Sequence, residues 1–123
     1  MTHRHHTIDY IELPVDDIDA AKRFYADAFG WAFTDYGPDY AGIQHPTEAG
    51  EEVGGLNGAG VDGPRGTGPL VQLYSDDLEA SVDAVTAAGG TITEAPFSFP
   101  GGRRFHFTDP AGNPLGVWSA SPQ

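Results

Sequence analysis

The sequence contains no cysteine, one methionine and only six Lys and Arg residues among 123. The absence of cysteine excludes disulfide bonds, thiolate metal sites and cysteine nucleophiles. Eighteen Asp and Glu residues outweigh the basic ones and give a formal net charge of -12. Such a charge repels phosphate backbones, so nucleic acid is disfavoured as a partner, as are anionic membranes. A well-solvated surface accounts for the acidity.

Long apolar runs are missing as well. No run approaches the roughly 20 residues that cross a bilayer, and no short apolar block follows a basic start as in a secretory signal. We therefore expect a cytoplasmic protein with no membrane partner. The length predicts a single domain over residues 1–123. The first residues, MTHRHHT, precede the first strand pattern and are interpreted as a mobile terminus.

The chain contains one unit twice. When residues 10–30 are placed over residues 70–90, aliphatic residues, paired aspartates and a final glycine coincide. Each copy begins as a strand and passes through two aspartates into a helix, because aspartate accepts hydrogen bonds from the free amides of a first helical turn. Only strand and turn patterns follow each helix. The sequence thus predicts two βαβββ units, about 8–58 and 69–119, joined by a Gly/Pro-rich segment.

Strand alternation separates two faces of the predicted sheets. The odd positions of the two leading strands are aliphatic: Ile11, Leu13, Val71 and Leu73. The even positions are mixed: Tyr10, Glu12, Pro14, Leu70, Gln72 and Tyr74. We expect the odd positions to face the helices, and the same alternation in the last strand puts Gly116 and Trp118 on the even side. A glycine inside that strand indicates a close approach by another group, or a missing side chain.

The doubled unit, the opening IELPVDDIDAAKRFYADAFGW and the closing FHFTDPAGNPLGVW resemble the vicinal oxygen chelate superfamily. This superfamily includes glyoxalase I, bleomycin-resistance proteins and extradiol dioxygenases. The resemblance extends from about Ile8 to Trp118. It implies an α+β fold in which two βαβββ repeats form a curved mixed sheet, a cup with the helices on its convex face and the ligand on its concave face. It also suggests a homodimer.

Metal-dependent members of this superfamily hold one divalent ion through His and Glu side chains from the first and last strands of each unit. The corresponding positions here are Tyr10, Leu70, the neighbourhood of residues 51–56 and Gly116. Leucine and glycine supply no donor, and a metal site needs about three well-placed protein ligands. We therefore expect no metal and no other cofactor, which disfavours metal-dependent glyoxalase or dioxygenase chemistry.

Without a metal, the side chains on the even face become the candidate ligand site. Tyr10, Tyr74 and Trp118 offer aromatic walls, and Gln72 adds an amide. Such a lining suits a small aromatic or amphipathic molecule. The aromatic residues in and after the first helix are interpreted as core; they are Phe24, Tyr25, Phe29 and Phe33.

Two residues are candidate catalytic groups. Glu12, in an apolar cup, acts as a general base or receives a cationic ligand, or alternatively pairs with Arg103 or Arg104 at the rim. His106 faces the cup and serves as acid, base or hydrogen-bond donor, or has a structural role. Three functions stay open: a metal-free binding protein; a metal-free or atypical-metal lyase, isomerase or dioxygenase-like enzyme that uses Glu12 or His106; and an interaction module whose own side chains fill the cup.

Overall fold

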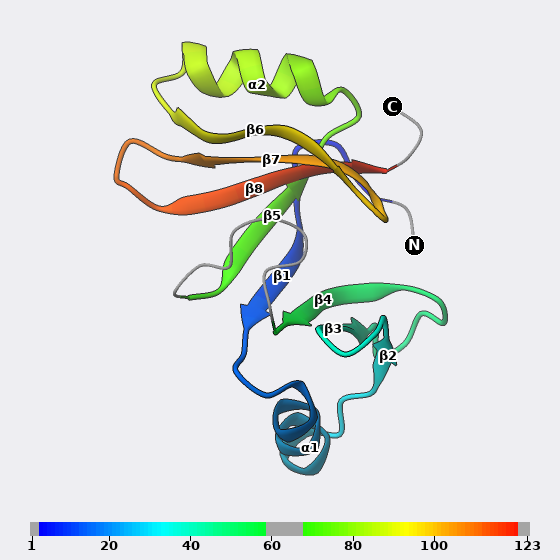
Figure 1. Cartoon of the computed structure of the whole chain (residues 1–123). Helices are drawn as coiled ribbons and strands as arrows, with labels where there is room; N and C mark the ends of the chain where they lie inside the picture. The colour runs from blue at the N-terminus through cyan, green and yellow to red at the C-terminus, as the bar shows by residue number, and fades with distance from the viewer. Residues whose placement is uncertain (1–2, 59–67, 121–123) are drawn as a thin grey trace. The chain divides into compact units, whose positions relative to one another are not determined.

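The first unit of the chain contains four strands and one helix. The computed structural model describes residues 3–58 and 68–120. In chain order the elements are β1 (Ile8–Pro14), α1 (Ile18–Phe29), β2 (Phe33–Asp35), β3 (Tyr40–Gln44) and β4 (Glu52–Asn57). The strands are hydrogen-bonded in the order β2-β3-β4-β1, with β1 and β4 parallel and the other pairs antiparallel (Figure 1).

The second unit repeats this order of elements. They are β5 (Leu70–Tyr74), α2 (Leu78–Ala87), β6 (Thr91–Phe99), β7 (Gly102–Thr108) and β8 (Pro114–Ala120). The strands are hydrogen-bonded in the order β5-β8-β7-β6, and β5 and β8 are again the parallel pair. The predicted α+β class, with two βαβββ units and mixed strand pairing, is confirmed. Residues 59–67 of the Gly/Pro-rich segment lie outside the described residues.

Residues 3–9, which precede most of β1, belong to the second unit, not to the first. The amide of His6 donates to the carbonyl of Tyr74 at 2.7 Å, and the amide of Tyr74 donates to the carbonyl of Thr7 at 3.1 Å. The interpretation of this segment as a mobile terminus is therefore wrong for residues 3–7. Backbone pairing with the end of β5, a contact far away in sequence, holds them in place.

Both helices begin at the second of the two paired aspartates. The side chain of Asp17 accepts from the amide of Ala20 at 3.0 Å, and that of Asp77 accepts from the amide of Ala80 at 3.1 Å. Each capping residue has an extended backbone, as an N-cap requires. The first helix ends at Gly30, whose φ of 72° lies in the left-handed region that glycine adopts readily. The aspartate steps of the repeat are thus confirmed as helix caps.

Helix α2 covers one face of the second sheet (Figure 1). Leu78 packs with Phe105, Phe107 and Val117 in a buried cluster. The partly buried residues around this cluster are Leu73, Val82, Val85, Ile92 and Leu115. Full burial of such side chains stabilises a fold by roughly 1.5–3 kcal/mol each. The odd positions of β5 and β8 face the helix, as the alternation predicted.

Helix α1 buries none of its residues. Phe24 and Phe29 are 59% and 64% exposed. Their rings instead contact the neighbouring rings of Tyr25 and Trp31, and Tyr25 stacks on Trp31 at 4.7 Å between centroids. The interpretation of Phe24 and Phe29 as core residues is therefore wrong, because the rings pack on one another and not under the helix.

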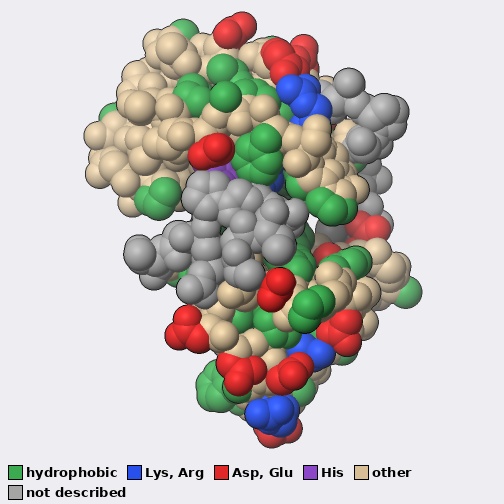
Figure 2. All heavy atoms as spheres, in the orientation of Figure 1, with side chains coloured by type: hydrophobic (Ala, Val, Ile, Leu, Met, Phe, Trp, Pro, Cys, Tyr) green, Lys and Arg blue, Asp and Glu red, His purple; other side chains and the backbone are tan. Residues whose placement is uncertain are grey.

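The surface of the protein is strongly acidic. Figure 2 shows Asp and Glu side chains spread over the face in view, with few Lys and Arg side chains among them. This distribution matches the formal net charge of -12. Neither α1 nor α2, the helices of the described residues, has the length and apolar character that crossing a bilayer requires.

Candidate functional site

The second sheet carries a row of polar and aromatic side chains on the face opposite α2. Gln72 pairs with Gly116, which pairs in turn with His106. Tyr74 pairs likewise with Trp118, which pairs with Arg104. Side chains of directly paired residues point to the same side of a sheet. These residues define what we call the even face of the second unit: Gln72, Tyr74, Arg104, His106, Gly116 and Trp118.

Polar groups on the even face are unusually well buried. Gln72, Arg104 and His106 are 3%, 2% and 8% exposed. Among the described residues, no hydrogen-bond donor reaches the buried Oε1 of Gln72. A buried acceptor without a donor costs free energy, about 1–3 kcal/mol, because it has lost its water. The Gln72 amide is therefore the group on this face that a bound molecule could satisfy.

Gly116 leaves the space that the Gln72 side chain occupies. A Cβ atom at position 116 would lie 3.1 Å from Oε1 and 3.2 Å from Cγ of Gln72. The sequence predicted that another group approaches this glycine closely, and that group is the side-chain amide of Gln72. A larger residue at 116 would push the amide away from the sheet.

Aromatic rings surround the buried arginine. The Arg104 guanidinium lies 5.4 Å from the ring centroids of both Phe97 and Phe99, within the range of a cation–π contact. The Phe97 ring also meets the His106 ring edge-on at 5.7 Å. Sequence alternation missed both phenylalanines, since the register of β6 against β7 shifts between Ile92 and Phe97.

The two arginines that the sequence offered as partners for Glu12 have different surroundings. Arg103 precedes Arg104 in β7, so its side chain points to the opposite face of the sheet, toward α2. There it forms a bidentate ion pair with Glu79 on α2, at 2.7 and 3.2 Å. This pairing accounts for Arg103 and corrects its assignment to Glu12. Arg104 lies on the even face of the second unit.

In the first unit, Glu12 lies at the end of a chain of hydroxyl groups. The Tyr40 hydroxyl donates to Glu12 Oε2 at 3.0 Å, and Asn57 Nδ2 donates to Oε1 at 3.1 Å. Because Tyr40 uses its hydrogen on Glu12, the Tyr10 hydroxyl donates to the Tyr40 oxygen, at 2.7 Å. Burial raises the pKa of Tyr10 and that of Tyr40, so both phenols keep their hydrogens at neutral pH.

The first unit contains a further phenol–carboxylate pair, between Tyr36, which directly follows β2, and Glu52 on β4. The Tyr36 hydroxyl donates to Glu52 Oε2 at 2.5 Å. This hydrogen bond raises the pKa of Tyr36 to about 12. A Cβ atom at Gly42 would collide with the Glu52 carboxylate, and one at Gly55 with the hydroxyl of Tyr40. Paired glycines in β3 and β4 therefore make room for these polar groups.

The positions that correspond to the superfamily's metal ligands do not suit a metal. Tyr10 is engaged with another phenol, while Leu70 and Gly116 have no donor atom in their side chains. Glu52, in the 51–56 neighbourhood, binds Tyr36. Across residues 3–58 and 68–120, no three His, Asp or Glu side chains gather closely enough to hold a metal ion. The donor set therefore does not fit a divalent ion.

The structure thus divides the predicted site residues between two places. Tyr10 and Glu12 belong to the hydroxyl chain of the first unit, together with Tyr40 and Asn57, which sequence reasoning missed. The other four predicted residues share the even face of the second unit; they are Gln72, Tyr74, His106 and Trp118.

Comparisons with known proteins agree with this architecture. The model of the Glyoxalase/Bleomycin resistance protein/Dioxygenase superfamily matches residues 7–117. CFP32 of Mycobacterium tuberculosis, named as a candidate glyoxylase, is 33% identical over an alignment of 124 positions that covers 97% of this chain and 48% of CFP32. The chain thus spans about half the length of that relative.

Solved structures show the same fold. The Mn(II)-bound glyoxalase from Novosphingobium aromaticivorans is 27% identical with a TM-score of 0.68, over 96% of this chain and 40% of that one. A member of the superfamily from Vibrio splendidus has a TM-score of 0.66 at 21% identity, over 92% of this chain and 99% of the other. The likeness to the second structure concerns the fold alone.

Proposed function

Because this chain belongs to the glyoxalase/bleomycin resistance protein/dioxygenase superfamily but carries Leu70 and Gly116 at two of the expected metal positions, we propose that it is a metal-free binding protein. Its ligand is a small aromatic or amphipathic molecule, held on the even face of the second unit. The protein acts in the cytoplasm, as a single domain of two units, and sequesters or senses its ligand.

One observation carries this proposal: the buried Oε1 of Gln72, which no donor in the described part of the chain reaches. An acceptor in this position is satisfied when a ligand brings an O–H or N–H group to it. The rings of Phe97, Phe99 and Trp118 surround the same face and suit a planar apolar body. The ligand therefore combines a flat ring system with at least one hydrogen-bond donor.

A matched pair of probes tests the donor requirement. We expect 2-naphthol, which has a hydroxyl donor, to raise the melting temperature of the protein more than 2-methoxynaphthalene, which has none. The difference should persist in EDTA, since no metal takes part. Equal shifts from both probes would contradict the assigned role of Gln72, and a shift that EDTA abolishes would contradict a metal-free site.

A substitution of the acceptor separates binding from stability. Gln72→Met keeps the length of the side chain and removes its polar atoms. We expect 2-naphthol to bind about tenfold more weakly, while the free energy of unfolding stays the same or rises, because a buried acceptor is gone. Gln44→Met, at an exposed glutamine of the first unit, is the control and should leave binding unchanged.

A second candidate function is metal-free acid–base catalysis by Glu12. The observation that favours it is the buried carboxylate, 4% exposed, at the end of the Tyr10–Tyr40 hydroxyl chain. Such a chain can relay a proton to or from a carboxylate. For any substrate that the protein converts, Glu12→Gln should abolish turnover and leave binding nearly intact. Full activity of this variant would exclude Glu12 as the base.

A homodimer is also part of the proposal. The exposed rings of Phe24 and Phe29 on α1 offer an apolar surface that a second copy could cover. Light scattering after gel filtration should give twice the chain mass for the wild type. Phe24→Ser with Phe29→Ser should give a monomer, and an unchanged mass in this variant would place the dimer contact elsewhere.

A further inference from the structure

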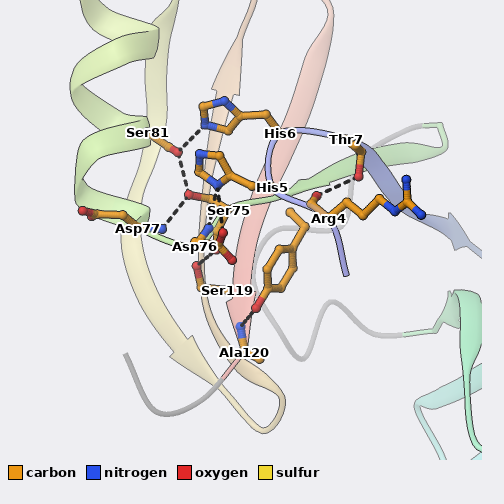
Figure 3. Close-up of polar contacts among 11 residues, drawn as sticks. Arg4, His5, His6, Thr7, Ser75, Asp76, Asp77, Ser81, Ser119 and Ala120 are labelled. Carbon is orange, nitrogen blue, oxygen red and sulfur yellow. Dashed lines mark hydrogen bonds and ion pairs between the residues drawn. The ribbon is translucent and has the colours of Figure 1, made fainter. Parts of the chain in front are cut away.

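The N-terminal histidines hold the start of the chain against the second unit. We call residues 3–7 the strap. The strap pairs through its backbone with Tyr74 at the end of β5. His5 Nδ1 accepts from the amide of Asp76 at 2.9 Å, and His6 Nε2 lies 3.3 Å from Ser81 Oγ on α2. Figure 3 shows both rings directed toward the turn between β5 and α2.

The first residue of the strap lies among the aromatic side chains at the edge of the even face. The His3 ring stacks on Tyr74, with centroids 4.9 Å apart and planes at 19°. It also meets the Trp118 ring edge-on at 4.7 Å. Tyr74 and Trp118 contact each other at 5.0 Å. A flat five-membered nitrogen ring thus occupies a place between two of the predicted ligand-binding residues.

A buried carboxylate fixes the orientation of this ring. The side chain of Asp9 is 7% exposed. Its Oδ1 lies 2.9 Å from His3 Nδ1, and its Oδ2 accepts from Trp118 Nε1 at 2.9 Å. Because a carboxylate only accepts, His3 Nδ1 carries the hydrogen. If the imidazole left, Asp9 Oδ1 would lose this donor, and a replacement ring with an N–H group at the same place would restore the hydrogen bond.

The strap itself is held in a disfavoured backbone conformation. His6 has a φ of 62°, and the other positive φ angles in the described residues are those of glycines. A non-glycine residue in the left-handed region stores strain. The strap is also short and exposed apart from His3, so displacing the His3 ring uncovers little buried surface beyond its own contacts with Tyr74, Trp118 and Asp9. These features suit a segment that a ligand can displace.

We propose that Tyr74, Trp118 and Asp9 form a binding subsite for a planar nitrogen heterocycle with an N–H donor, and that the chain's own His3 occupies this subsite until such a ring displaces it. The subsite extends the even face, and so its role in ligand binding rests on the proposed function. His3 shows the contacts that the site selects: stacking on Tyr74, an edge to Trp118 and a donor to Asp9. The strap thereby weakens the apparent affinity of the subsite for the ligand, because only the open fraction of molecules binds it.

Titration with benzimidazole tests the proposal. The parent protein for this titration is the chain with the substitution Trp31→Phe. Trp118 is then its one tryptophan and reports binding through its fluorescence. We expect His3→Ala to bind benzimidazole about tenfold more tightly than the parent, because no internal ring competes. The control His45→Ala makes the same substitution in the first unit and should leave the affinity unchanged. Equal affinity in His3→Ala and the parent would overturn the proposal.

A change in the ligand tests the donor to Asp9. N-Methylbenzimidazole has the same rings without the N–H group. We expect His3→Ala to increase the affinity for N-methylbenzimidazole much less than the affinity for benzimidazole. An equal gain would refute the role of Asp9.

Nuclear magnetic resonance of the unaltered chain gives a measurement that needs no variant. Saturation with benzimidazole should move the His3 ring signals toward those of a solvated histidine and leave those of His45 in place. If His3 signals stay unchanged while benzimidazole binds, the ring is not displaced and the proposal fails.

The two proposals fail in different ways. Binding of benzimidazole that depends on His3, without any response to 2-naphthol, supports the subsite and refutes the Gln72 site. Binding of 2-naphthol that depends on Gln72, with no effect of His3→Ala on benzimidazole, supports the proposed function and overturns the subsite.

Discussion

Two glycines in the last strands of the two units should respond very differently to alanine. At Gly116, a new Cβ atom would lie 3.1 Å from Oε1 and 3.2 Å from Cγ of Gln72, both in a flexible side chain. At Gly54, it would collide with the main-chain carbonyl oxygen of Ile11. Ile11 is the direct partner of Gly54 in the parallel pair of β1 and β4, so this oxygen cannot retreat without disturbing the sheet.

These contacts set the size of the two effects. Alanine is favoured over glycine inside a strand by about 0.5–1 kcal/mol, and moving the Gln72 amide by a few tenths of an ångström costs about as much. We therefore expect Gly116→Ala to change the free energy of unfolding by less than about 1 kcal/mol. Overpacking against a fixed backbone costs more, and Gly54→Ala should lose about 3 kcal/mol or fail to fold.

Urea unfolding followed by far-UV circular dichroism measures both variants. Gly116→Ala should also bind 2-naphthol several-fold more weakly than the wild type, because the added methyl group displaces the Gln72 acceptor. Equal losses of stability in the two variants would refute the distinction between a side-chain and a backbone obstacle. Unchanged 2-naphthol binding in Gly116→Ala would refute the link between this glycine and the ligand.

Three further predictions concern pH, helix capping and metals. Folding raises the pKa of Tyr36 from 10.0 to about 12. The hydrogen-bonded phenol therefore contributes its full stabilisation below pH 10, and this stabilisation is lost as the pH rises to about 12. Urea unfolding midpoints should fall less over this pH range in Tyr36→Phe than in the wild type. Asp17→Ala should lower the free energy of unfolding by about 1 kcal/mol because it removes the cap, whereas Asp19→Ala in the first turn should have a smaller effect, both measured by urea unfolding. EDTA should leave the melting temperature unchanged, and a fall of several degrees would reveal a stabilising metal.

Local patterns in the sequence predicted the skeleton of the fold. The repeated aspartate pair marked both helix starts, because an aspartate before a helix caps its first turn. The carboxylate accepts a hydrogen bond from the backbone amide of Ala20 in one helix and of Ala80 in the other. Alternation placed Gln72 and Trp118 on the face opposite α2, since the side chains of a regular strand repeat every two residues. Both signals depend only on near neighbours in the chain.

Features that depend on distant contacts escaped the sequence. Phe97 and Phe99 were missed because irregular pairing of β6 with β7 breaks the two-residue period. The strap was interpreted as mobile because nothing in MTHRHHT reveals pairing with Tyr74, which lies far along the chain. Phe24 was assigned to the core since helical spacing does not distinguish a buried stripe from an exposed one.

The affinity of the Gln72→Met variant for 2-naphthol, measured by isothermal titration calorimetry in EDTA beside the wild type, tests the central claim most directly. The claim is that the buried Oε1 of Gln72, which no donor within residues 3–58 and 68–120 reaches, receives the ligand in place of a metal ion. It predicts measurable binding by the wild type in EDTA and about tenfold weaker binding by the variant. Equal affinity in the two proteins, or binding that appears only when a divalent metal is added, would contradict it.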